Sequence, residues 1–212
     1  MLNRNHIIIF FFFFSLLAGL SAQTNILNQN GYNKFYYENG RLSSEGTMRD
    51  GKPDGYWKNY YENGKIKIEG NRRNFQLDSV WKFYDQKGKL TKTIEYKEGK
   101  KNGKTLVYDS SVKVISLETY KNDIKQGPVK TFYRGGKTKT YVNYEKGRPD
   151  GTGYEYSIDS LITAISVYQG GILVSYERIN QRDDNNKKQG IWKEFHENLE
   201  VKKEMKFNDD SL

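Results

Sequence analysis

Few residues of this chain could take part in catalysis. The sequence contains no cysteine, and His196 is the one histidine beyond the apolar N-terminal segment. No nucleophile motif accompanies His196, which falls where other copies of an internal repeat carry tyrosine. Glu45 and Glu69 are a second candidate, because equivalent carboxylates two strands apart lie about 10 Å from each other, near the upper limit for an inverting glycosidase. This pair follows from repetition alone, so we predict no catalytic residue, no cofactor and no metal site, and hence no enzyme.

Basic side chains offer a different chemistry, the binding of anions. The formal net charge is +9, but the basic residues form no continuous block, so no nucleic-acid partner is expected. One column follows a turn glycine and contains Arg41, Lys65, Lys89, Lys113 and Lys137; another contains Lys34, Lys58, Lys82, Lys130 and Lys193. Such a row could bind an anionic lipid, a polysaccharide or an acidic protein. Alternatively, the lysines only keep an exposed sheet edge soluble and unpaired.

Aromatic side chains are the third group of candidates, in a chain with 17 tyrosines, 11 phenylalanines and 3 tryptophans. The regular columns of Tyr60 and Tyr96 are expected to stack between neighbouring repeats and to hold a sheet together. Tryptophan occurs in only some repeats and could form an exposed binding patch of Trp57, Trp81 and Trp192. The same applies to Tyr37, Tyr61 and Tyr133, which are predicted to lie on the strand face opposite the Tyr60 column.

All of these candidates belong to a pattern that recurs every 24 residues. The clearest column contains Tyr36, Tyr60, Tyr84, Tyr108, Phe132 and Tyr156, and a glycine column contains Gly31, Gly55, Gly103, Gly127 and Gly151. A fixed period of this length is typical of a repeat array. We expect about seven units in residues 31–212. The late return of the pattern at Gly190 predicts a loop insertion of about 15 residues within 172–189.

Each unit is predicted to consist of two antiparallel strands. Aromatic residues at 56–61 favour the extended conformation, and Asn63-Gly64 indicates a tight type I′ turn before the return strand. A glycine-rich connection leads to the next unit, and Pro53 and Pro149 are expected in it rather than in a strand. The predicted fold is therefore all-β, an elongated single-layer antiparallel meander of repeated β-hairpins. Its open ends could associate end to end.

The anchor residues resemble the MORN repeat, in its bacterial variant form. The resemblance is carried by YEKGRPDG at 144–151, YKEGKKNG at 96–103, GYW at 55–57 and YYENGK at 60–65, and it covers about residues 31–212. It implies an open, twisted antiparallel sheet that serves as an interaction surface. Some members of the family are catalogued as antitoxin-like, and MORN repeats in other settings are linked to membranes. The matching residues are structural, so the resemblance identifies the fold and leaves the partner open.

The first 22 residues are predicted to be a signal peptide. The apolar run at 7–20 is shorter than the roughly 20 residues of a membrane-spanning helix, and the small residues Ser21 and Ala22 follow it. Cleavage is expected near Ala22, and a retained anchor is the alternative. Residues 23–30 are predicted to be a polar linker.

These features predict a secreted or periplasmic protein of the cell envelope. Its expected role is a protein–protein interaction or scaffold module with a protein partner. Two alternatives are binding of an anionic envelope component, either lipid or polysaccharide, through the basic columns, and antitoxin-like neutralisation of a partner protein.

Overall fold

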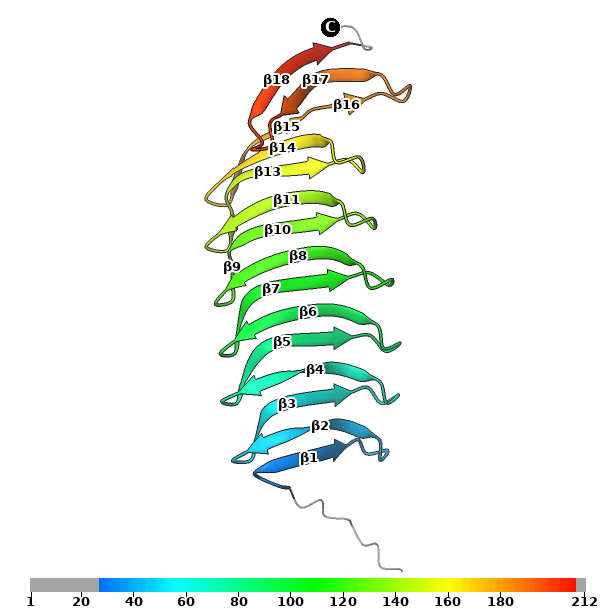
Figure 1. Ribbon diagram of the computed structural model, residues 1–212, viewed down its shortest axis with the longest axis vertical. Helices are drawn as coiled ribbons and strands as arrows, with labels where there is room; N and C mark the ends of the chain where they lie inside the picture. Colours follow the sequence, from blue (N-terminus) through cyan, green and yellow to red (C-terminus); the bar gives the residue numbers. More distant parts are fainter. Residues whose placement is uncertain (1–26, 209–212) are drawn as a thin grey trace, which may run out of the picture.

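The structure is a computed structural model that describes residues 27–208. Within this range every regular element is a β-strand, and the strands are stacked like rungs along one long axis (Figure 1). The strands are β1 (Gly31–Tyr36), β2 (Leu42–Arg49), β3 (Lys52–Tyr60), β4 (Ile66–Arg73), β5 (Gln76–Tyr84), β6 (Leu90–Lys97), β7 (Lys100–Tyr108), β8 (Val114–Lys121), β9 (Ile124–Lys125), β10 (Gly127–Phe132), β11 (Thr138–Glu145), β12 (Arg148–Pro149), β13 (Gly151–Tyr156), β14 (Ile162–Gln169), β15 (Ile172–Arg178), β16 (Gln181–Arg182), β17 (Lys188–Phe195) and β18 (Val201–Phe207).

Strands β1 to β15 form one open antiparallel sheet in which sequence neighbours pair, and β16, β17 and β18 form a second sheet. Each pair of main strands corresponds to one unit of the sequence pattern, and β9 and β12 are short interruptions at the start of a unit. The predicted all-β meander of repeated hairpins is confirmed.

Two kinds of turn alternate along the sheet, and their assignment differs from the prediction. At the hairpin turn the Tyr61 amide donates to the Lys65 carbonyl (2.8 Å), and the Gly64 amide donates to the Tyr61 carbonyl (2.9 Å). Among these turn residues only Gly64 has a positive φ, +82°, so the turn is a type I turn with a glycine bulge. The type I′ geometry lies between units instead, where Asp50 and Gly51 have φ of 50° and 71°.

The tight turn between units leaves the two prolines inside strands. Pro53 lies in β3 opposite Met48, next to a register shift, and Pro149 lies in the two-residue strand β12. A proline is tolerated at such irregular positions because the ladder does not need its missing N–H. The expectation that both prolines lie in a connection is therefore corrected.

The hydrophobic face of the sheet is covered by its own side chains. Met48, Trp57 and Trp81 are its buried centre, and Phe35, Ile68, Leu77, Phe83 and Tyr96 pack against them. Trp57 lies over Gly46, and Trp81 lies over Gly70; a Cβ atom added at either glycine would come within 2.3 Å of the indole. Each indole therefore fills the space that the glycine of the preceding strand leaves empty.

In later units the two partners of this contact change size together. Thr105 takes the tryptophan position and Ile94 takes the glycine position, and the two residues are paired across β6 and β7. Further on the sizes are reversed, since a Cβ atom at Gly153 would meet the Val142 side chain at 3.2 Å. Glycine is thus kept where its partner is Trp57 or Trp81, and larger residues replace it in units that lack the tryptophan.

Residues 27–30, the second half of the predicted linker, are joined to the first unit. The Gly51 amide donates to the Gln29 carbonyl (3.0 Å), and the Asp50 amide donates to the Asn30 side chain (2.9 Å). Equivalent bonds link later units, such as the Gly99 amide to the Leu77 carbonyl (2.8 Å). The signal peptide predicted at 1–22 lies outside the described residues and stays a prediction.

The structure has strands where the sequence predicted a loop at 172–189. β15 pairs with β14, β16 pairs with β17, and only 183–187 forms the turn between them. Asn180 is buried at the break between β15 and β16. Its side chain donates to the carbonyls of Ile162 (2.9 Å) and Lys193 (3.0 Å), and accepts from the Lys193 amide (2.7 Å). These bonds join the two sheets. Asn180, one of the polar residues that suggested a solvated loop, therefore connects the end of the main sheet to the second sheet.

Substitution of Gly70 tests the packing of tryptophan on glycine. We expect Gly70→Ala to lower the free energy of unfolding by about 1–3 kcal/mol, because the added methyl group overlaps the Trp81 ring. The measurement is urea unfolding followed by tryptophan fluorescence. Gly135→Ala is the control, since nothing lies within 4 Å of a Cβ atom there. Equal losses in the two variants would contradict the explanation.

Candidate interaction surface

The three tryptophans do not form an exposed patch. Trp57, Trp81 and Trp192 are 8%, 4% and 8% exposed. Their indole N–H groups are also used internally: Trp81 donates to the Asn71 carbonyl (2.9 Å), and Trp192 donates to the Gln181 carbonyl (3.2 Å). The predicted binding patch of tryptophans is corrected, because each ring is needed to cover its own sheet.

Tyr37, Tyr61 and Tyr133 lie on the hairpin edge, the side of the sheet formed by the turns within units. Their hydroxyl groups donate to main-chain carbonyls of the next unit, at Tyr60 (2.5 Å), Tyr84 (2.7 Å) and Tyr156 (2.7 Å) respectively. Each phenol therefore links one hairpin to its neighbour. These residues are partly buried and contribute to the array before any partner binds.

The basic column at the same edge has a similar role over its first three members. Arg41 donates to the Glu62 carbonyl (2.7 Å), Lys65 to the Lys87 carbonyl (2.8 Å) and Lys89 to the Ser110 carbonyl (2.9 Å). Lys113 and Lys137 are exposed at the same positions in later turns. The column thus fixes successive turns to one another, and only part of its charge is directed at solvent.

The second basic column alternates with acidic residues across the sheet. Strand pairing places Lys34, Glu45, Lys58, Glu69 and Lys82 in one continuous row over β1 to β5, which we call the charged row. The row lies on the face opposite Trp57 and Trp81, since its members are sequence neighbours of residues on the buried face. Beyond Lys82 it continues through the uncharged residues Thr93, Leu106 and Leu117 before it reaches Lys130 in β10.

Tyrosines hold the two carboxylates of the charged row. Tyr60 donates to Glu45 (2.5 Å) and Tyr84 donates to Glu69 (2.6 Å). Glu69 is only 8% exposed, so it is not a solvated surface carboxylate. A buried carboxylate is stabilised by such a hydrogen bond and by flanking ammonium groups. Each carboxylate of the pair therefore has a structural partner.

The hydrogen bonds are reflected in the acidity of the groups. Burial raises the pKa of Tyr60 and Tyr84, and their bonds to the carboxylates raise it further. The bond from Tyr60 lowers the pKa of Glu45. Burial, followed by contact with Glu69, raises the pKa of Tyr56 to about 12.

Two tyrosines beside the charged row remain open to solvent. Tyr32 and Tyr56 are 57% and 48% exposed, and equivalent residues of adjacent units lie about 10 Å apart. Tyrosines with a solvent-facing ring and a polar end are typical of protein interfaces. The charged row and these two rings together form the flat face of the first three units.

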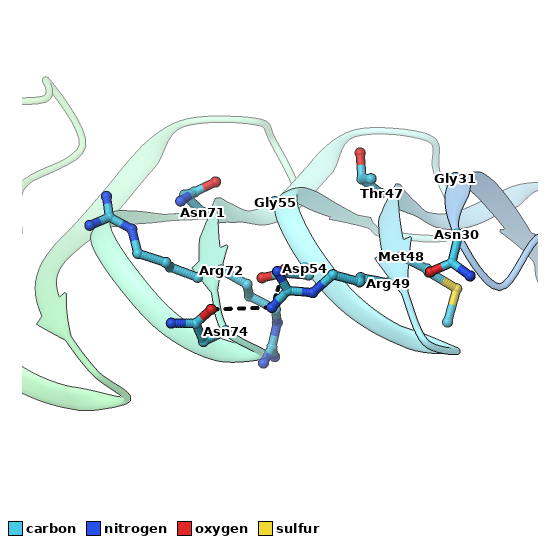
Figure 2. A pocket seen from close by; sticks show the side chains of 11 residues that line it. Asn30, Gly31, Thr47, Met48, Arg49, Asp54, Gly55, Asn71, Arg72 and Asn74 are labelled. Carbon is cyan, nitrogen blue, oxygen red and sulfur yellow. Dashed lines mark hydrogen bonds and ion pairs between the residues drawn. The ribbon is translucent and has the colours of Figure 1, made fainter.

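A hollow of about 540 Å³ lies at the opposite edge, where the first two units connect. Figure 2 shows its polar lining, in which Arg49 points toward Asp54 (3.0 Å) and Asn74 (3.2 Å). Arg72 donates to the Phe75 carbonyl (3.0 Å) and lies over the Trp81 ring. Arg49 and Arg72 are thus each engaged within the fold, while Nε of Arg72 is buried without a hydrogen-bond partner.

His196 and the acidic residues are the remaining candidates for chemistry. His196 is an exposed residue in the turn before β18, where its amide donates to the Glu200 carbonyl (2.9 Å). Residues 27–208 contain no cluster of histidine and carboxylate side chains placed to hold a metal ion. In the same range no helix has the length and apolarity needed to span a membrane.

Sequence reasoning missed Gly46 and Gly70, which the two indoles require. They recur 24 residues apart and precede Trp57 and Trp81 by 11 residues each, so the signal was present as a pair of columns. It also missed the role of Asn180. This residue has no counterpart in other units, so it gives no periodic signal.

Comparison with known protein families agrees with this architecture. Residues 29–50, 53–74 and 77–98 match the MORN repeat variant in three consecutive copies. Among curated proteins, no sequence is significantly similar to the chain. The matched segments are the units that carry the indole–glycine contacts and the charged row, and the match supports a MORN repeat protein.

Replacement of one hairpin tyrosine tests the link between units. We expect Tyr61→Phe to lower the free energy of unfolding by about 1 kcal/mol, because the Tyr84 carbonyl loses its phenolic donor. Urea unfolding measures the change. Tyr36→Phe is the matched control, since the Tyr36 side chain is exposed; a comparable loss there would argue against a specific role of the Tyr61 hydroxyl.

Alkaline titration tests the contact between Tyr56 and Glu69. The folded-state pKa of Tyr56 is raised from 10.0 to about 12, so its contribution to stability is complete below pH 10 and is lost as the pH rises toward 12. We expect wild-type stability to fall more steeply across this range than that of Tyr56→Phe. The measurement is the free energy of unfolding of both proteins at each end of the range, and parallel curves would contradict it.

Proposed function

We propose that the protein is an exported, non-enzymatic interaction module whose flat face, over the first three units, binds a partner protein. MORN repeats are generally protein or lipid interaction modules, and a binding role agrees with the three repeats matched here. The observation that carries the proposal is the alternation of charge along the row Lys34, Glu45, Lys58, Glu69 and Lys82.

Alternating charge favours a folded partner over a uniform polyanion. A lipid surface or an acidic polysaccharide would meet Glu45 as well as the lysines, so repulsion would offset part of the attraction. A protein can present carboxylates to the lysines and basic groups to Glu45 while packing on the exposed rings of Tyr32 and Tyr56. At the hairpin edge, Arg41, Lys65 and Lys89 are already bonded to carbonyl groups, which further weakens the case for an anionic ligand.

Export is supported by the N-terminal sequence. Its apolar run at 7–20 is short, and it is followed by the small residues Ser21 and Ala22 and then by polar residues. The mature chain would then begin at Gln23, only a few residues before the unit that carries Tyr32. The flat face would be displayed in the periplasm or outside the cell, where its partner must also be found.

Affinity capture with charge-reversed variants tests the proposal. The protein, expressed from its full-length coding sequence, is used to capture ligands from a cell-envelope extract at low and high salt. We expect a protein that is retained by the wild type, is weakened by high salt and is lost with Lys58→Glu, because this change places three acidic residues in succession. The intact mass of the purified protein shows whether the leader has been removed near Ala22.

Lys121→Glu is the control, because it alters the net charge equally at an exposed position away from the flat face. Capture of lipid or polysaccharide that both variants lose alike would overturn the proposal and favour an anionic ligand. A captured toxin would identify antitoxin-like neutralisation as the form the interaction takes.

A further inference from the structure

The main sheet ends at β15, and the outer edge of this strand is unpaired. β15 pairs with β14 on one side, and within residues 27–208 no strand pairs with its other side. The chain leaves the sheet after Arg178, and the next strands form the separate sheet of β16, β17 and β18. Figure 1 shows these strands beyond β15, at the end of the stack. The backbone groups on the outer edge of β15 are therefore available to another strand.

The exposed edge is uncharged over five consecutive residues, four of which are apolar. Ile172, Leu173, Val174 and Tyr176 are 71%, 51%, 59% and 47% exposed, and Ser175 is also exposed. No charged residue or proline interrupts the segment from Ile172 to Tyr176. An exposed, uncharged and apolar edge strand is the type of edge that pairs with other chains.

The edges of β1 and β18 are protected in different ways. At β1, residues 27–30 fold back, and Asn28 and Asn33 exchange hydrogen bonds of 2.8 Å and 2.7 Å. β18 carries Lys202, Lys203, Glu204 and Lys206, which discourage pairing by their charge. β15 has neither kind of protection, so its open edge is specific to this position in the array.

The break that exposes this edge is built into the fold. Ile179 is fully buried, and Asn180 satisfies its amide group with the main chains of β14 and β17. Gln181 also donates to the Thr163 carbonyl (2.9 Å). These bonds turn the chain away after Arg178. Lys193 of β17 pairs with Glu177 at the end of β15 (2.8 Å), whereas the segment from Ile172 to Tyr176 stays exposed.

We infer that β15 is a dimerisation strand, which pairs antiparallel with β15 of a second copy of this chain. A two-fold axis at Val174 places the uncharged residues 172–176 of one copy opposite the same uncharged residues of the other. It also places Glu177 and Arg178 of each copy opposite Gly170 and Gly171 of the other, so no like charges meet. The dimer then forms through the same surface of both copies, and the two main sheets join into one longer sheet.

Sedimentation velocity across a concentration series tests the dimer. The protein expressed from its full-length coding sequence is expected to show a monomer–dimer equilibrium. Val174→Lys is expected to raise the dissociation constant about tenfold or more, because two ammonium groups would then face each other near the axis. Val201→Lys, at an exposed valine of the edge strand β18, is expected to dimerise as the wild type does. Far-UV circular dichroism checks that both variants are folded.

Cross-linking then locates the contact. The chain has no cysteine, so Val174→Cys and Val201→Cys each introduce a single thiol. A short bis-maleimide is expected to link two copies of the Val174→Cys protein and not of the Val201→Cys protein. A wild-type protein that sediments as a monomer at every concentration, or a dimer that Val174→Lys leaves unchanged, would overturn the inference. Selective cross-linking at position 201 would instead place the contact at the end of the array and overturn it as well.

Discussion

A sheet of a single layer has no second layer on which to bury its hydrophobic face, and the structure of this protein depends on how that problem is met. On the buried face, large side chains of one strand fill the space that small residues leave on the neighbouring strand. Trp57 over Gly46 and Trp81 over Gly70 are the clearest cases. Because the covering residue and the covered residue belong to different strands, no strand can bury its face alone. Cohesion therefore comes from contacts between neighbours, as expected of a repeat array.

The same dependence on neighbours governs the hairpin edge. Each turn has main-chain carbonyls that the turn itself does not use, and the preceding unit supplies a phenol or a basic group to bond them. Tyr61 and Lys65 do this for the third unit, at Tyr84 and Lys87. The hairpin edge and the buried face are thus committed to cohesion in the early units. The flat face over β1 to β5 keeps exposed rings and charges, which is why it is the better place for a partner.

The periodic sequence predicted the fold well, because a 24-residue period with glycine and aromatic anchors matches one hairpin per unit. It predicted the surface less well, because a recurring residue is equally visible whether it faces solvent or bonds to its neighbour. Tyr37, Arg41 and Trp57 recur for internal reasons, and periodicity alone could not show this. The turn types were exchanged, since positive φ at two successive residues is taken here by Asp50-Gly51 and by Asn74-Phe75. The break at Ile179 and Asn180 occurs once and leaves no periodic trace.

The glycine of the hairpin turn shows how strongly neighbours determine the backbone. Val112 and Leu199 occupy the position of Gly64, yet both keep a left-handed conformation, with φ of 60° and 65°. A β-branched residue such as valine is rarely found in this region because of steric crowding. Adjacent turns therefore act as a template that enforces the shape of a unit whose own sequence no longer favours it. Substitutions can consequently accumulate in one unit while its neighbours preserve its form, and single units are free to diverge toward new surfaces without loss of the array.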